Sequence, residues 1–439
     1  MITKIFLKNK LIFFTLISFF ILFGRSFSGV SILGYRVGEW VTAFCLLLSI
    51  IFLFLSYKRY HEYLIGKEIN IIHKLIILSF FLELVLNFPV NRSTYIFKAS
   101  SYIWIIITLY IGNLIFSKIN YEYNFFNSFF IFLPIIFIFQ TTFFPDFVKT
   151  FFLNFSDKFE FLKAGDVLLI FVLSLLVLQN TLSNSLKYKT IFLFTFSIFL
   201  PYFLYASKGA FLAATVFLIL QLKSIKSVFT KFTLKNISIL IGSIILFFSS
   251  TFYIYGNFIF EKVPGESKDI VVSLDIVDSL SAIVDERNTT EAFFSFYVDR
   301  GRLYSEDVTA NWRLQIWQDI IHDLNQSNNL AFGYGYNEII PAMDDKERRG
   351  SDGKNENVHN YFINIFARGG LLQLLLFMTF HCFIVIYYFR KFQNFKILKF
   401  MIPIFIVSFF DTSMESVRFP FLYYSFIGYF FNEDSIYLQ

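Results

Sequence analysis

The chain has 439 residues, of which 56% are hydrophobic and only 16% are charged, with a formal net charge of +6 and a mean hydropathy of +0.60. Soluble domains usually carry about 25% charged residues, so this chain has too few polar side chains to cover a water-facing surface. The composition therefore excludes an ordinary soluble protein and indicates that a lipid bilayer covers much of the chain.

A membrane-spanning helix needs roughly 20 mostly apolar residues. By this criterion we expect an all-α integral membrane protein with about twelve transmembrane helices. Their predicted ranges are 11–23, 37–57, 69–88, 95–116, 125–143, 164–180, 190–206, 209–222, 234–255, 361–389, 397–411 and 419–431. The first range resembles a signal peptide, but no small-residue cleavage site follows it, so we interpret it as an uncleaved first span.

The distribution of basic residues predicts the orientation of the spans. If both termini lie in the cytoplasm, the inner connections hold eighteen Lys and Arg and the short outer connections hold nine. Because cytoplasmic loops carry the excess of basic residues, we expect both termini on the cytoplasmic side.

One large hydrophilic segment interrupts the pattern between the ninth and tenth predicted spans. Residues 256–356 hold 19 of the 32 acidic residues and contain no stretch long enough to span a membrane. The predicted organisation is therefore spans 1–9 in residues 1–255, a large outer loop in 256–356 and spans 10–12 in 357–439. Within the loop, the spacing of apolar residues predicts an amphipathic helix over 309–324. A Gly-Tyr-Gly-Tyr turn at 333–336 follows it.

His359 is the most prominent candidate for acid–base chemistry. It stands where the hydrophilic loop meets the tenth predicted span, and a histidine at this boundary can exchange protons near neutral pH. The alternative interpretation is an interfacial histidine that only anchors the helix end.

Cations in the predicted outer segments are the second candidate feature. Guanidinium groups bind phosphate through two parallel hydrogen bonds and stay charged, so several of them converging on one cavity would suit a pyrophosphate. Ion pairing with the acids of the loop and snorkelling are the alternatives. The cations are Arg92, Lys208, Arg302 and Arg313. Trp317 lies on the predicted helix of Arg313, and two acids, Asp411 and Glu415, lie near the last outer turn.

These features together resemble the bacterial O-antigen polymerase/O-antigen ligase family of polytopic membrane glycosyltransferases. Three local patterns contribute to the resemblance: a turn Ser207-Lys208-Gly209, a helix with Arg313 and Trp317 that leads to the glycine turn, and His359-Asn360 followed by a span containing Gly370. The sequence departs from the family pattern in two places, with Lys208 in place of arginine and Gln373 in place of a second glycine.

The resemblance implies an inverting glycosyl transfer from undecaprenyl pyrophosphate on the periplasmic face of the bacterial inner membrane, with no cofactor and no metal. On this reading His359 is the general base, and Arg313, with Lys208, Arg92 and Arg302, stabilises the departing pyrophosphate. Asn360, Asp411, Glu415 and Trp317 support the site. The implied partners are a lipid-linked oligosaccharide donor, a glycan acceptor, the bilayer and a chain-length regulator protein. No nucleic acid is implied.

Three functions remain open at the level of the sequence. The first is a polymerase that joins lipid-linked repeat units, and the second is a ligase of the same family that moves finished glycan onto lipid A–core. The third is a transporter of lipid-linked oligosaccharide, a class that often shows repeated halves and charges near the membrane midplane. The large loop and the scarcity of midplane charges favour an enzyme over a transporter.

Overall fold

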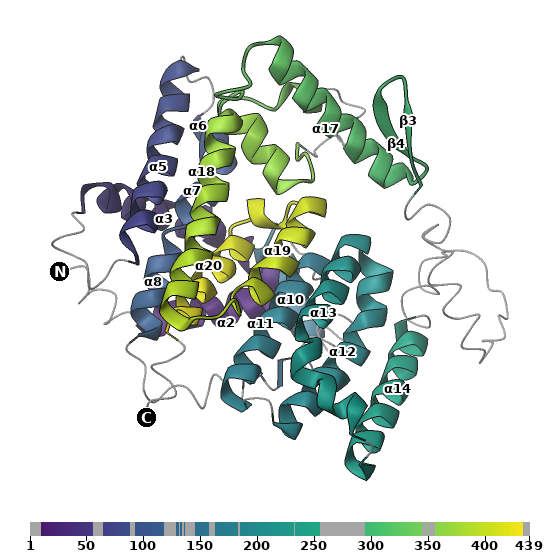
Figure 1. Cartoon of the computed structure of the whole chain (residues 1–439). Helices are drawn as coiled ribbons and strands as arrows, with labels where there is room; N and C mark the ends of the chain where they lie inside the picture. The colour runs from purple at the N-terminus through teal and green to yellow at the C-terminus, as the bar shows by residue number, and fades with distance from the viewer. Residues whose placement is uncertain are drawn as a thin grey trace.

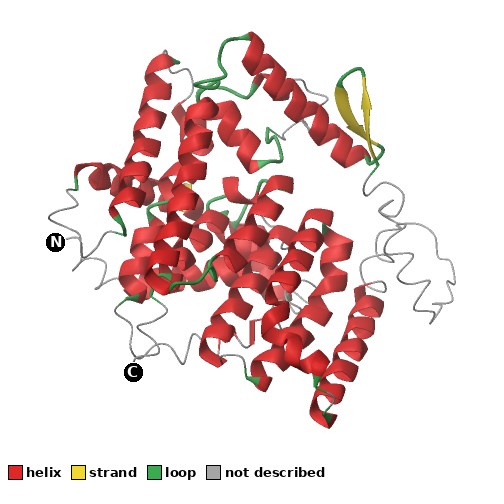
Figure 2. Cartoon of the chain, viewed as in Figure 1, coloured by secondary structure: helices red, strands yellow, loops and turns green. Residues whose placement is uncertain are grey.

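The computed structural model is almost entirely helical, with two short β-hairpins (Figures 1 and 2). Its description covers residues 10–55, 65–87, 93–117, 129–130, 132–133, 136, 145–157, 163–182, 185–231, 233–254, 295–344, 348 and 356–432. Every structural statement below concerns these residues. Arg92 and most of the predicted fifth span lie outside them.

Eight of the described helices are long and apolar enough to cross a membrane. This confirms an all-α membrane protein with several spans, while the count of about twelve stays a prediction. The eight are α2 (Lys10–Ser28), α3 (Val37–Phe54), α5 (Lys67–Leu86), α11 (Ala164–Leu182), α12 (Leu186–Ala206), α13 (Lys208–Thr230), α14 (Leu234–Ile254) and α18 (Tyr361–Phe392).

Shorter helices occupy three of the other predicted spans. The fourth is divided into α6 (Ser93–Ala99), α7 (Ser101–Ile105) and α8 (Thr108–Phe116), and the last two are α19 (Leu398–Phe410) and α20 (Arg418–Phe430). Two features of the bundle were not expected from the sequence, and neither was the β-hairpin of the outer loop, at 296–305. The two features are the helix α10 (Asp146–Phe155) and the small hairpin of β1 (Ser31–Ile32) and β2 (Tyr35–Arg36).

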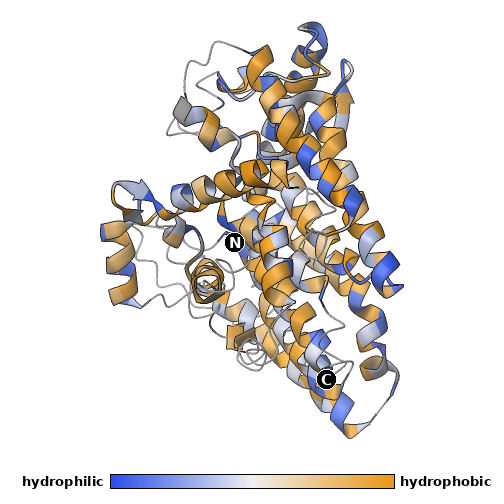
Figure 3. Cartoon of the chain, turned by 90° about the vertical axis from the view of Figure 1, so that its left-hand side faces the viewer, coloured by the Kyte–Doolittle hydropathy of each residue, from blue (hydrophilic) through white to orange (hydrophobic). Residues whose placement is uncertain are grey.

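The helices differ in how much of their surface other helices cover. In α11 most residues are buried, because α12, α13, α19 and α20 all pack against it. In contrast, α14 leaves apolar side chains such as Ile241, Ile244 and Ile245 exposed, as expected of a helix that faces lipid tails. Figure 3 shows mainly hydrophobic residues along the bundle, with hydrophilic residues around the segment of α17 and at helix ends.

A cap lies over one end of the bundle (Figure 1). It contains a hairpin of β3 (Phe296–Asp299) and β4 (Arg302–Ser305), the helix α17 (Val308–Gln326) and a short 3₁₀ helix, Pro341–Met343. The helix predicted over 309–324 is therefore confirmed. Its apolar face, which includes Ile316, Ile320 and Leu324, packs against Met343, Val358 and Ala367 in a second hydrophobic core.

The cap is joined to the bundle through a break in α18. Gly370 has a φ of +63°, which interrupts the helix and frees backbone groups of the residues around it. The carbonyls of Ala367 and Arg368 accept hydrogen bonds from the amides of Tyr334 and Gly335, at 2.8 and 2.9 Å. The amides of Leu371 and Leu372 donate to the carbonyls of Leu330 and Ala331, at 2.9 and 3.1 Å. The segment of residues 330–335 after α17, which includes the first part of the glycine turn, therefore completes the hydrogen bonding of a broken apolar helix.

We expect Gly370→Ala to lower the apparent melting temperature of the purified protein strongly. With a ψ of −166°, Gly370 adopts a conformation that is essentially restricted to glycine, and another residue there costs about 1–3 kcal/mol. A Cβ at this position would also lie 2.3 Å from the backbone of Ala331, and such overpacking adds about 1–3 kcal/mol. Gly34→Ala is the matched control, because Gly34 has a φ of +83° but no heavy atom within 4 Å of its added Cβ. Equal losses in the two variants would show that the docked turn contributes nothing.

Candidate functional site

The polar candidate site lies where α17, the first turn of α18 and the ends of α13 and α19 meet. The helix α17 and its N-cap contribute two charged groups, and each of the other three elements contributes one charged or titratable group. Because the groups come from segments far apart in the sequence, only the docking of the cap on the bundle brings them together. We call Lys208, Asp307, Arg313, His359 and Asp411 the seam cluster.

His359 has an unusual backbone conformation, with a φ of +53° immediately before α18 begins. Histidine is one of the few residue types that enter this region with some frequency, and such strain is found often at functional sites. Its ring packs edge-to-face on Trp312 of α17, with 5.2 Å between the ring centroids. The imidazole is therefore held between the cap and the bundle.

The electrostatic surroundings of His359 favour its neutral form. Burial and the positive charge of Arg313 lower its pKa from 6.5 to about 4, and Lys163 acts in the same direction. Asp411 opposes this shift without cancelling it. At neutral pH the ring is therefore uncharged and able to accept a proton.

Asn360, the next residue, caps α18. Its Oδ1 accepts hydrogen bonds from the amides of Phe362 and Ile363, at 3.0 and 3.1 Å, which fixes the start of the helix directly after His359. The amide nitrogen Nδ2 of the same side chain is buried and has no acceptor among the described residues. Asn360 thus presents one unused donor beside the histidine.

Arg313 lies on α17 within electrostatic reach of Asp307 and Asp411. Burial lowers its pKa, and the two carboxylates oppose that shift, so the guanidinium remains charged. Its Nε is buried and, within the described part of the chain, finds no acceptor. A second unused donor is therefore present near His359.

Lys208 and Asp307 tie the bundle to the start of α17. The Nζ of Lys208 forms an ion pair with Oδ2 of Asp307, while Oδ1 of Asp307 accepts the amide of Ala310 at 2.6 Å and caps α17. Burial raises the pKa of Asp307, but the hydrogen bonds and charge of Lys208 outweigh it, and the net shift is downward. Gly209 allows the start of α13 to lie close to the end of α19, since a Cβ there would lie 2.8 Å from Cβ of Phe410.

Trp317 supports the histidine through the preceding residue. Its Nε1 donates to the carbonyl of Val358 at 2.7 Å, and its ring packs edge-to-face on Phe409 of α19. Trp317 therefore contacts both the His359 segment and α19, and its supporting role in the site stays a prediction.

The two acids predicted near the last outer turn occupy different surroundings. Asp411 ends α19, accepts hydrogen bonds from Thr412 and Ser413, and interacts with the charges of Arg313 and His359. Glu415 is buried, which raises its pKa to about 8, although Arg368 opposes the shift. Asp411 therefore belongs to the seam cluster, whereas Glu415 interacts with the charges of Arg368 and Asp411.

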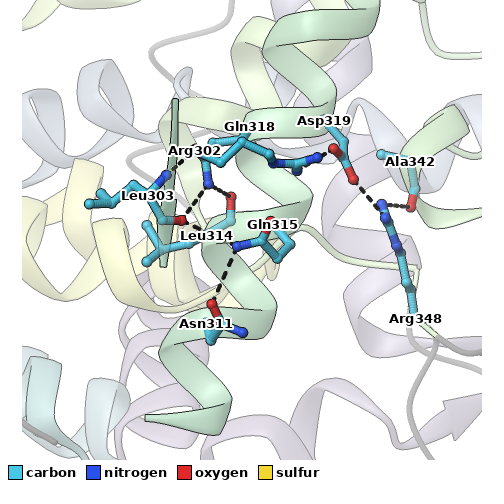
Figure 4. A network of polar contacts seen from close by, with 9 residues as sticks. All are labelled: Arg302, Leu303, Asn311, Leu314, Gln315, Gln318, Asp319, Ala342 and Arg348. Atoms are coloured by element: carbon cyan, nitrogen blue, oxygen red, sulfur yellow. Dashed lines mark hydrogen bonds and ion pairs between the residues drawn. The ribbon is translucent and has the colours of Figure 1, made fainter. Parts of the chain in front are cut away.

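The structure places Arg302 in another network. Its guanidinium pairs with Asp319 at 2.5 Å, and Arg348 pairs with the other carboxylate oxygen of Asp319 at 2.6 Å (Figure 4). These contacts connect the hairpin and the end of the cap to the outer part of α17. Arg302 thus strengthens the cap rather than joining the seam cluster.

Three charged residues around the site were not singled out from the sequence. Lys163 precedes α11 and acts on His359, and Asp307 caps α17 and pairs with Lys208. Arg368 is buried in α18 and donates to the carbonyls of Gly335 and Glu338 and to Tyr95 Oη, the last at 2.6 Å. A charge inside a predicted span is itself a signal, and it could have identified Arg368.

The fold and this site define a multi-pass membrane protein with a polar cluster between a capping segment and the ends of its spans. Residues 167–378 match the family model described as O-Antigen ligase. The chain therefore carries an O-antigen ligase family domain over these residues, which confirms the family resemblance seen in the sequence. Lys208, Arg313 and His359 all lie inside the matched region, and Asp411 and Glu415 lie outside it. The comparison with curated proteins gave no match.

We expect Trp317→Phe to destabilise the protein by about 1–3 kcal/mol, because it leaves the buried carbonyl of Val358 without its donor. Trp40→Phe is the matched control, since Nε1 of Trp40 also donates to a carbonyl, that of Ile32 at 3.1 Å, but at an exposed position. Thermal unfolding of the two purified variants compares the costs. A loss for Trp40→Phe as large as that for Trp317→Phe would contradict the assigned role.

Proposed function

We propose that this protein is a glycosyltransferase that joins undecaprenyl-pyrophosphate-linked repeat units of a surface polysaccharide on the periplasmic face of the bacterial inner membrane. The family domain supports polymerase or ligase chemistry. The observation that carries the proposal is the pair of buried, unused donors, Arg313 Nε and Asn360 Nδ2. Arg313 acts electrostatically on the neutral His359, and Asn360 is the next residue along the chain. Phosphate and sugar oxygens are acceptors of the kind that these donors lack.

In this mechanism His359 accepts the proton of the acceptor hydroxyl as the hydroxyl oxygen attacks the anomeric carbon. The new glycosidic bond forms as the bond from that carbon to the pyrophosphate oxygen breaks, which inverts the configuration. Negative charge develops on the leaving undecaprenyl pyrophosphate, and Arg313 stabilises it. Lys208 supplies a second cation once the ligand competes with Asp307 for it.

The identity of the acceptor distinguishes the two activities of the family. The description of the matching model names a ligase, which keeps transfer to lipid A–core as the second candidate. A deletion strain separates the two. Loss of a polymerase leaves core bearing one repeat unit, whereas loss of a ligase leaves bare core and an accumulation of lipid-linked glycan.

We expect His359→Ala to reduce glycan transfer by about 10²–10⁴-fold without changing the protein level, because the general base is lost. His322→Ala is the matched control, since His322 lies exposed on α17. Transfer is measured with purified protein and a lipid-linked repeat unit. Retention of near-normal product length in His359→Ala would exclude the histidine as the base.

The pH profile follows from the pKa of His359. In the free protein the imidazole has a pKa of about 4, below its ordinary 6.5, so the neutral base persists until the pH falls to about 4. We therefore expect the acid limb of kcat/KM near pH 4. Between pH 6.5 and 4, His359 binds a proton more readily in the unfolded chain than in the folded protein. The contribution of the neutral ring to the free energy of unfolding is therefore complete above pH 6.5 and declines as the pH falls towards 4. An acid limb at 6.5 would contradict this assignment.

A further inference from the structure

The end of the bundle opposite the seam cluster is basic and nearly free of acidic residues. Residues 167–260 and 357–410 contain no Asp or Glu, although several lysines fall at the far ends of α12, α13 and α18–α19. The lysines at this end therefore have few carboxylates on their own helices with which to form ion pairs. A lysine that is partly buried there needs another source of negative charge.

Four residues of α11, α13 and α19 form a polar group at this end, which we call the lysine–glutamine cluster: Gln179, Gln221, Lys223 and Lys399. The Nζ of Lys399 donates to Oε1 of Gln221 at 3.0 Å, and Nε2 of Gln221 donates to Oε1 of Gln179 at 3.0 Å. Both glutamines are buried. The ammonium of Lys399 is thus positioned by a chain of two hydrogen-bonded, neutral glutamine side chains.

The cluster carries positive charge without a matching carboxylate. Lys399 is partly buried and lies within electrostatic reach of Lys396 and Lys223. An ammonium has three N–H donors, and among the described residues the one acceptor of Lys399 is Gln221. Neither Lys223 nor Lys399 forms an ion pair with an acid in the described part of the chain. A bound anion would therefore relieve both the repulsion and the unmet donors.

The position of the cluster favours a lipid as the source of that anion. Lys399 is twelve residues from Asp411 along the α19 segment, which corresponds to about 18 Å at the rise of an α-helix. The hydrocarbon core of a bilayer is about 30 Å thick, so the cluster lies beyond the midplane, in the half of the bilayer opposite the seam cluster. Ile219 and Leu222, beside Lys223 on α13, are large apolar side chains exposed on the helix surface. An acyl chain can cover these residues while its headgroup reaches the lysines.

We propose that the lysine–glutamine cluster binds the phosphate of an anionic phospholipid in the leaflet opposite the seam cluster. Basic pockets between transmembrane helices are suited to such headgroups. The site is independent of the proposed transferase activity, because it shares no residue with the seam cluster.

The test uses the purified full chain in detergent with phosphatidylglycerol or phosphatidylcholine added in mixed micelles. The apparent melting temperature of the wild type should rise by several degrees more with phosphatidylglycerol than with phosphatidylcholine. The variant Lys223→Gln/Lys399→Gln should lose this difference. The matched control Lys226→Gln/Lys235→Gln removes two exposed lysines from the same end and should keep it.

Three results would overturn the proposal. The first is a full phosphatidylglycerol effect in the Lys223→Gln/Lys399→Gln variant, and the second is an equal loss in the control variant, which would indicate general surface charge. The third is an equal stabilisation by inorganic phosphate, which would indicate a site for the free anion. If the double variant does not purify, Lys399→Gln alone gives the same comparison.

Discussion

The break in α18 at Gly370 is the constraint on which the arrangement of the site depends. In an apolar environment every freed backbone group needs a partner, because no water is present to replace a lost helical hydrogen bond. The chain meets this requirement with residues 330–335 after α17, which donate to two freed carbonyls and accept from two freed amides. The first part of α18, with His359 at its start, is consequently fixed to the same unit as α17 and Arg313.

The seam cluster follows from this docking. Arg313 comes from the cap, His359 from the start of α18, and Lys208 and Asp411 from the bundle, so no single segment contains the site. Burial keeps the histidine neutral while the guanidinium beside it stays charged. This combination of a proton acceptor and a fixed cation is what transfer from a pyrophosphate donor requires. The proposed lipid site at the other end of α13 and α19 would anchor the same helices in the opposite leaflet.

Much of the architecture could be predicted from the sequence, because the membrane restricts spans to long apolar helices. The ranges predicted for spans such as 37–57 and 234–255 agree closely with α3 and α14. The division of 95–116 into three helices could not be foreseen, because neither proline nor glycine marks its breaks, at Ser100 and at Ile106–Ile107. The close approach of α8 to α20 was not predictable either: a Cβ on Gly112 would lie 2.3 Å from the carbonyl oxygen of Ser425. Hydropathy also does not distinguish an amphipathic helix such as α10 from the end of a span.

For the site, the sequence identified residue types and order but not pairing. His359 and Arg313 were found because each stands at a predicted boundary or on a periodic helix. The separation of Arg302 from Arg313 was not predictable, because it depends on which side of α17 faces the bundle. Gln373, a departure from the family pattern, is buried and accepts hydrogen bonds from the hydroxyls of Tyr102 and Tyr336. Only the folded structure shows that this residue replaces glycine without loss of polar pairing.

The most direct test of the account compares two conservative arginine substitutions in glycan transfer by purified protein. Arg313→Lys keeps the charge but removes the planar fork, and Arg302→Lys does the same within the Asp319 network. The account predicts a loss in kcat of about 10-fold or more for Arg313→Lys, because a transition-state donor is lost, and near-normal transfer for Arg302→Lys. Normal transfer by Arg313→Lys, or a larger loss in Arg302→Lys, would contradict the placement of the reaction at the seam cluster.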